Sequence, residues 1–64
     1  MKIVIIGAGS VAFTPAILSG LGTDPRYRGA SIGLVDVDEA ALELIASFAA
    51  RISREFQRDW IVEA

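Results

Sequence analysis

The chain of 64 residues contains no cysteine and no histidine. Without cysteine there is no disulfide framework, and without either residue the two commonest soft ligands for a metal ion are missing. Only carboxylates remain as metal ligands. Asp36, Asp38 and Glu39 are too close together at a strand-to-helix junction to converge on one ion. We therefore predict no metal site among these residues.

Positive charge is scarce as well, with six Lys and Arg against eight Asp and Glu and a net charge of -2. A chain without a basic tract is poorly suited to binding a phosphate backbone, so we expect no nucleic-acid partner. The longest apolar run, Ile3 to Ile6, is far shorter than the roughly 18 residues that cross a bilayer. The amino terminus also lacks a signal-peptide pattern. We expect a cytoplasmic protein that does not bind membranes.

The order of hydrophobic patterns alternates between strand and helix. Lys2–Ile6 is a β-branched run typical of a strand buried on both faces, and 31–36 is a second strand. Apolar residues at helical spacing follow each strand, and the stripe from Leu42 to Phe56 predicts a core-facing helix of about five turns. A third strand begins at 60–62. The pattern predicts an α/β fold, the Rossmann-type β-α-β-α-β opening of a doubly wound parallel sheet.

Apolar residues make up 53% of the chain, which is high near the lower size limit of independent domains. Either copies of the chain or further parts of a longer protein must cover this surface. A sheet of two and a half strands leaves an edge and much of both faces open. We therefore expect residues 1–64 to be the amino-terminal part of a NAD-binding Rossmann domain, with the remainder and a catalytic domain absent.

Pro15 leaves the start of the first helix open, because proline fits only the first helical turn. With Thr14 as the N-cap the preceding glycine loop is unusually long, whereas with Ser10 as the N-cap the early helix is distorted. The second helix has clearer signals, with Asp38 as its N-cap and Glu39 in its first turn. Three arginines, Arg51, Arg54 and Arg58, are predicted to form a solvated helix end.

The segment Gly7-x-Gly9-x-x-Ala12 fits the G-x-G-x-x-G/A fingerprint of dinucleotide-binding folds. Gly7 permits the tight turn after the strand, and Gly9 allows the backbone to approach a diphosphate. Ala12 is expected to keep helix and strand close. Backbone amides at the helix start would bind the phosphates, and Ser10 could add its hydroxyl. We predict cofactor contacts at Gly7, Gly9, Ser10 and Val11, with a purely structural turn as the alternative.

Asp36 ends the second predicted strand, where an acidic residue can accept hydrogen bonds from the adenosine ribose. Its charge would repel the 2'-phosphate of NADP, and no Arg follows it, so NAD is the expected cofactor. Asp36 lies 29 residues after Gly7, more than the usual spacing of roughly 20. The polar loop from Thr23 to Gly29 explains the excess. The alternative is that Asp36 serves only to start the next helix.

With these residues in view, the chain resembles the amino terminus of family 4 glycoside hydrolases. The shared features are Gly-Ala-Gly-Ser-x-x-Phe-Thr-Pro at Gly7 to Pro15, Asp24-Pro25 with Gly29 in the loop, and Leu-Val-Asp-x-Asp-Glu from Leu34 to Glu39. The resemblance covers nearly all of the chain and accounts for the proline that the general fingerprint leaves unexplained.

The resemblance implies an enzyme that uses NAD and a divalent metal, commonly Mn²⁺, to oxidise a sugar at carbon 3, eliminate the leaving group, add water and reduce the carbonyl again. It places Gly7, Gly9 and Ser10 at the cofactor phosphates and Asp36 at the ribose. The family's metal ligands and catalytic base lie beyond residue 64, so no residue here is catalytic. The whole enzyme would take a small sugar substrate, of a type left open, and form a homo-oligomer.

Two other readings remain. The first is a NAD-dependent dehydrogenase of the lactate and malate type, which shares the strand, the glycine turn and the acidic strand end. The second is a non-catalytic piece that binds a nucleotide or only associates with itself. Residues after 64, in particular a Cys and His pair, would separate the two enzymes. In the long loop, Tyr27 and Arg28 could approach an adenine or a neighbouring subunit.

Overall fold

Strands and helices alternate along the chain in the computed structural model, which describes residues 1–64. The elements are β1 (Lys2–Ile6), α1 (Thr14–Gly22), the 3-10 helix η1 (Pro25–Tyr27), β2 (Ser31–Val35), α2 (Glu39–Phe56) and β3 (Ile61–Glu63). The predicted order of strands and helices is confirmed. The third strand begins one residue later than expected, and no helix is long and apolar enough to span a membrane.

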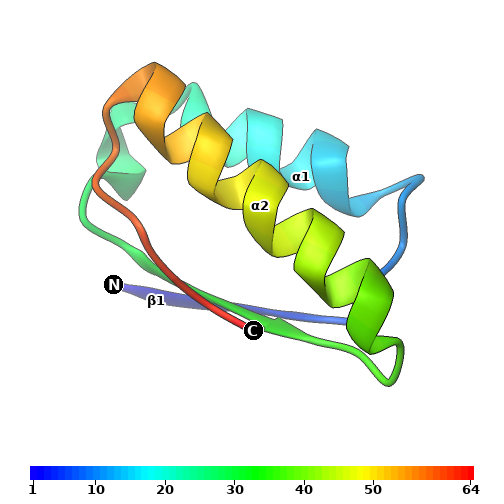
Figure 1. The fold of residues 1–64 in the computed structure, drawn as a ribbon. Helices are drawn as coiled ribbons and strands as arrows, with labels where there is room; N and C mark the ends of the chain where they lie inside the picture. The colour runs from blue at the N-terminus through cyan, green and yellow to red at the C-terminus, as the bar shows by residue number, and fades with distance from the viewer.

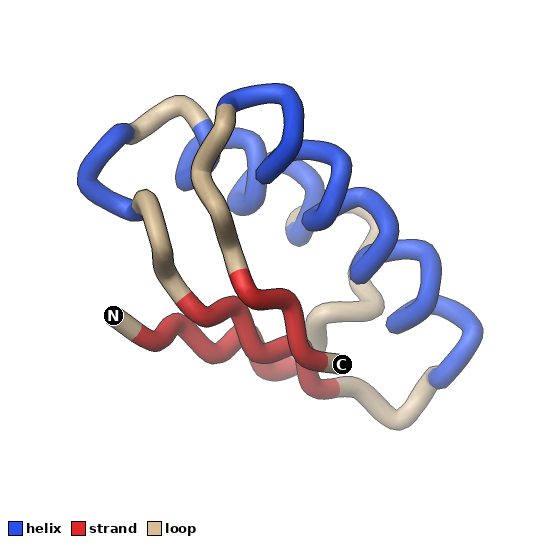
Figure 2. The backbone as a smooth tube through the Cα atoms, turned by 60° about the vertical axis from the view of Figure 1, so that its left-hand side comes forward, coloured by secondary structure: helices blue, strands red, loops and turns tan.

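The three strands form one parallel sheet in the order β1-β2-β3. The central strand β2 sets Ile32 opposite Ile3 on one side and opposite Val62 on the other. Both helices cover the same face of this sheet and lie side by side (Figure 1), and Figure 2 shows the strands together beneath them. This is the Rossmann-type opening that the sequence predicts.

The core lies between the sheet and the two helices. It contains Ile32 and Leu34 from β2 and Leu18 from α1, all at most 3% exposed. Helix α2 contributes the buried residues of the predicted apolar stripe, namely Ile45, Ala49 and Ile52. The apolar spacing in α2 therefore marks the core face correctly, although Phe56 at its end is more than a third exposed.

The opposite face of the sheet is uncovered in this chain. Since side chains alternate along a strand, Val4 and Ile6 point away from the helices and are 51% and 83% exposed. Val35 and Ile61 are exposed as well. The prediction that β1 is buried on both faces is wrong for residues 1–64, because both helices pack on one face.

Helix α1 begins at Thr14, and Phe13 is its N-cap residue without a capping side chain. Pro15 therefore sits in the first turn, where its missing amide costs little. Of the two predicted N-caps, Thr14 is off by one residue, because it is the first residue of the helix, and Ser10 is wrong. Helix α2 begins as predicted, with the Asp38 carboxylate accepting a hydrogen bond from the Ala41 amide at 3.1 Å.

The two helices approach closely at Gly22, the last residue of α1. A Cβ atom at Gly22 would collide with Ile52 and lie 3.2 Å from Cδ2 of Phe56. The Arg58 side chain reinforces this contact, because its Nε donates to the Gly22 carbonyl at 2.7 Å. Arg58 is therefore a structural residue, and the prediction that it belongs to a solvated helix end is wrong. Arg51 and Arg54 are exposed, as predicted.

Because of this contact, alanine substitutions at two glycines of α1 are expected to change the free energy of unfolding in opposite directions. Gly22→Ala is expected to lower the free energy of unfolding by about 1 to 3 kcal/mol, because the added methyl group overpacks the helix contact. Gly20→Ala meets no atom within 4 Å and is expected to raise it by about 0.5 to 1 kcal/mol, as alanine is the better helix former. Urea unfolding of both variants checks this, and equal effects would contradict the close approach.

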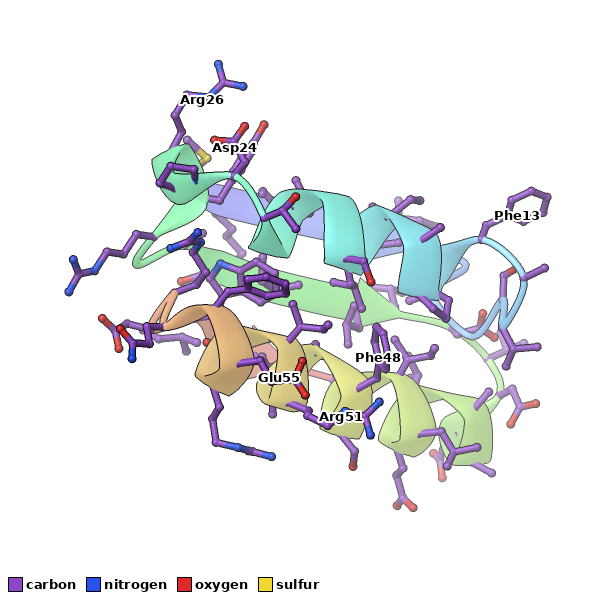
Figure 3. The ribbon with its side chains drawn as sticks, turned by 90° about the horizontal axis from the view of Figure 1, so that it is seen from above. Phe13, Asp24, Arg26, Phe48, Arg51 and Glu55 are labelled. Carbon is purple, nitrogen blue, oxygen red and sulfur yellow. The ribbon has the colours of Figure 1, made fainter.

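The loop from Thr23 to Gly29 lies at the edge of the sheet where β2 begins. The Arg26 guanidinium and backbone amide bind the Asp24 carboxylate and lower the pKa of Asp24 to about 2. Figure 3 shows Asp24 and Arg26 at the end of the molecule opposite Phe13. Tyr27 and Arg28 belong to this loop, away from the glycine turn, and their approach to an adenine or to a neighbouring subunit stays a prediction.

Candidate functional site

The glycine turn and Asp36 lie at the same edge of the sheet. In a parallel sheet the carboxyl ends of neighbouring strands meet, so the segment after β1 and the segment after β2 come together. Figure 1 shows both turns at one end of the ribbon, the first in blue and the second in green. A small hollow at this edge is lined by Ile6, Gly7, Val35, Asp36 and Val37.

The first glycine turns the chain sharply out of β1. Gly7 has φ +76°, a left-handed conformation that other residues rarely adopt. This conformation lets the amides of Gly7 and Ala8 both donate to the Val35 carbonyl, at 2.7 and 3.0 Å. The predicted role of Gly7 in the turn is therefore confirmed. Its amide is used within the fold.

The second glycine faces the end of β2. The Gly9 amide donates to Oδ2 of Asp36 at 2.9 Å. A Cβ atom at Gly9 would lie 2.9 Å from that same oxygen and 3.0 Å from Cβ of Ala41 in α2. The fingerprint predicts that the absence of a side chain at Gly9 allows the approach of a diphosphate. The structure shows a second reason, namely that the Asp36 carboxylate occupies the space beside Cα.

The Asp36 carboxylate is half-buried and bound at both oxygens. Oδ1 accepts from the Asp38 amide at 2.9 Å and Oδ2 from the Gly9 amide. The bond from Asp38 and then that from Gly9 hold the pKa of Asp36 below its ordinary value, while partial desolvation opposes them. The group is therefore an anion at neutral pH, with a fixed position between the two turns.

Four exposed amides surround the start of α1 without an acceptor in the chain: those of Val11, Ala12, Phe13 and Ala16. The Ser10 amide makes a longer bond of 3.3 Å to the Gly7 carbonyl, and its hydroxyl makes no hydrogen bond within the chain. Among the predicted contacts, Val11 thus offers a free amide and Ser10 a free hydroxyl. Ala12, Phe13 and Ala16 were missed, although Pro15 is the signal for the delayed helix that frees them.

Ala12 differs from its predicted role. The fingerprint assigns the third small residue to close packing between helix and strand. Here Ala12 is exposed, because it lies in the turn before α1, whereas Ala8 and Thr14 are buried at 0% and 2% exposure. The contact between turn and core is therefore made by other residues. Phe13 is also exposed and points away from the ribbon (Figure 3).

The chain offers little for direct metal binding. No three of its acidic side chains gather closely enough to hold a metal ion together. Asp36 is already bound by two amides, and the Asp38 carboxylate caps α2. The arrangement at this edge is instead suited to an anion beside the free amides and to hydroxyl donors beside the carboxylate.

Fold and turn together define a Rossmann-type α/β chain. Residues 2–64 match the sequence profile of the Family 4 glycosyl hydrolase family, and the chain belongs to that family. Among known proteins it is 39% identical over 51 residues to an alpha-galactosidase of Rhizobium meliloti (strain 1021). That match covers 80% of this chain and 10% of the relative, so the chain spans about a tenth of the relative's length. No solved structure matches it significantly.

Proposed function

We propose that this chain is the NAD-binding segment of a family 4 glycosidase. The observation that carries the proposal is the meeting of two complementary groups at one sheet edge. The free amides of Val11, Ala12, Phe13 and Ala16 lie after the glycine turn, and the ionised Asp36 carboxylate lies at the end of the adjoining strand. A dinucleotide presents a diphosphate and a ribose diol that match these two groups.

The amides fit the diphosphate. Val11, Ala12, Phe13 and Ala16 each present an N–H group without a partner, and they lie at the positive end of the dipole of α1. The Ser10 hydroxyl can donate to the same phosphates. The Gly7 and Gly9 amides are held by Val35 and Asp36, so these glycines would shape the turn while the following amides bind the ligand.

The carboxylate fits the adenosine ribose. Asp36 keeps acceptor capacity at both oxygens beyond the two amide bonds, because a carboxylate has about four acceptor sites. No Lys or Arg lies in residues 7–13 or 36–50, so nothing near the turn would neutralise a 2'-phosphate. These features favour NAD over NADP, and Val37, fully exposed beside Asp36, is an apolar neighbour for the ligand.

Family membership supports the reaction that the whole protein would perform. When bound, NAD supplies the hydride acceptor for transient oxidation of a sugar at carbon 3, which allows cleavage of the O-glycosidic bond by elimination and water addition. Residues outside this chain would hold Mn²⁺ and supply the catalytic base. The alpha-galactosidase relative points to an α-galactoside substrate, and the family match favours a glycosidase over a lactate-type dehydrogenase. We further propose a cytoplasmic homo-oligomer.

Replacing Asp36 with alanine tests the ribose contact. In the full-length protein, Asp36→Ala should lower the affinity for NAD relative to that for NADP by about tenfold or more, because NAD loses its ribose hydrogen bonds to a charged acceptor, whereas for NADP the repulsion between the carboxylate and the 2'-phosphate is removed. Isothermal titration calorimetry with both nucleotides measures the ratio. Glu39→Gln is the matched control, since it removes a nearby exposed charge that makes no hydrogen bond to the glycine turn or to Asp36. An unchanged ratio would refute the ribose role.

A further inference from the structure

We infer that Asp36 is also a positioning residue, which holds the glycine turn in its binding conformation before any ligand arrives. This inference rests on the proposed function for its consequence in binding, but its structural core is independent of it. A carboxylate that served only the ribose would have no need to contact the turn. Here one of its oxygens is bonded to the Gly9 amide at 2.9 Å.

Both ends of this contact are fixed. On its own side, Asp36 is held by the Asp38 amide at 2.9 Å, and the Asp38 side chain in turn caps α2. On the other side, the amides of Gly7 and Ala8 are anchored to the Val35 carbonyl. The Gly9 amide is therefore the last amide along the loop after β1 that donates a hydrogen bond to the end of β2.

The backbone from Ser10 to Phe13 makes few other hydrogen bonds. The Ser10 amide makes a 3.3 Å bond within the turn, and the Thr14 amide reaches back to the Ser10 carbonyl at 3.0 Å. The amides of Val11, Ala12 and Phe13 have no partner at all. Since a turn of this kind is ordered mainly by its hydrogen bonds, loss of the bond at Gly9 would release the segment that presents the free amides.

The space around Gly9 supports the same conclusion. A Cβ atom there would meet Oδ2 and Cγ of Asp36 at 2.9 and 3.0 Å, and Cβ of Ala41 at 3.0 Å. The absence of a side chain at position 9 thus lets the carboxylate reach the backbone amide. The glycine and the aspartate act as one unit, and the carboxylate connects ribose recognition to the shape of the diphosphate loop.

Hydrogen exchange of the ligand-free protein tests the positioning role directly. In Asp36→Ala and in the similarly shaped Asp36→Leu, which carries no acceptor, the Gly9 amide should exchange about tenfold to a hundredfold faster than in the wild type, because a bond to a charged acceptor is lost. Residue-resolved exchange, by NMR or by fragmentation mass spectrometry, measures this rate. The matched control, Glu39→Gln, should leave the Gly9 rate unchanged. If Asp36→Ala fails to fold, Asp36→Leu carries the measurement, and an unchanged Gly9 rate in the folded variant overturns the inference.

Binding of a trimmed ligand separates the two roles of Asp36. The probe is a NAD analogue whose adenosine ribose lacks both hydroxyl groups, so that it has no ribose contact to lose. Asp36→Leu should still weaken this analogue by about fivefold or more, because the diphosphate loop is less ordered. Removal of a negative charge would by itself favour an anionic ligand, so such a loss cannot arise from electrostatic repulsion.

Equal affinity of the wild type and Asp36→Leu for the analogue would show that Asp36 acts through the ribose alone, and would overturn the positioning role in binding. If the wild-type protein binds neither NAD nor the analogue, the proposed function fails. The exchange rate of Gly9 still decides the positioning role in that case, so the two failures can be told apart.

Discussion

Replacing Ile32 with alanine is expected to lower the free energy of unfolding by about 2 to 5 kcal/mol. Ile32 lies in the central strand, paired with Ile3 and Val62, and its side chain is fully buried between the sheet and the helices. The loss combines the missing apolar contacts with a cavity at the centre of the sheet, where neighbours on both sides are fixed. Urea unfolding followed by circular dichroism measures it.

The matched control is another large aliphatic residue of the same chain. Leu44 in α2 is 68% exposed, so Leu44→Ala removes little buried surface and should change the free energy of unfolding by no more than about 0.5 kcal/mol. If the two variants were destabilised equally, the core would not lie between the helices and β2. The difference between them therefore tests the packing of the whole chain.

Gly9→Ala is expected to weaken NAD binding by between about fivefold and a hundredfold, the range that corresponds to overpacking at a tight site. The added methyl group cannot fit beside Asp36 and Ala41 unless the carboxylate or the turn moves. Either movement disturbs the amides that follow. Calorimetric titration of the full-length protein with NAD measures the effect.

Gly20→Ala serves as the control, because a methyl group there meets open space in α1 and should leave NAD affinity unchanged. A second comparison uses the Asp36→Ala background, in which Gly9→Ala should cost less than in the wild type, since part of the collision is removed. Full additivity of the two substitutions would contradict the contact between Gly9 and Asp36.

Much of the fold could be predicted from local signals. The β-branched run Lys2–Ile6 forms β1 with the predicted boundaries, and Asp38 caps α2 as its position before an apolar stripe indicates. These features depend on residues that are close together in the sequence, so the local sequence pattern is enough to predict them. The alternation of strands and helices then predicts a parallel sheet, because a helical crossover between two neighbouring strands leaves them running in the same direction.

The details of the site depend on contacts between distant residues, and these were not predicted. Gly9 and Asp36 are 27 positions apart, and Arg58 is 36 positions from the Gly22 carbonyl that it binds. Hydrophobic spacing contains no information about such polar contacts. The sequence does not decide the start of α1 for a related reason, since Pro15 is compatible with more than one first turn and the fold selects one.

The candidate site was predicted in part. The fingerprint predicts the turn, and the end of the second strand places Asp36 beside it. The sequence does not show which backbone amides donate hydrogen bonds within the chain and which stay free. Gly7 and Gly9 give their N–H groups to Val35 and Asp36, whereas Val11 and the next residues keep theirs free. The spacing of the motif indicates where a ligand would bind, and the hydrogen bonds of the turn indicate with which atoms.

The central claim is that the turn after β1 binds the diphosphate of NAD while Asp36 binds its adenosine ribose. A crystal structure of the full-length protein with NAD tests this most directly. We expect diphosphate oxygens within hydrogen-bond distance of free amides between Val11 and Ala16, and the ribose hydroxyls on the Asp36 carboxylate. A nucleotide bound at another edge of the sheet, or a diphosphate that leaves these amides without contact, would contradict the account.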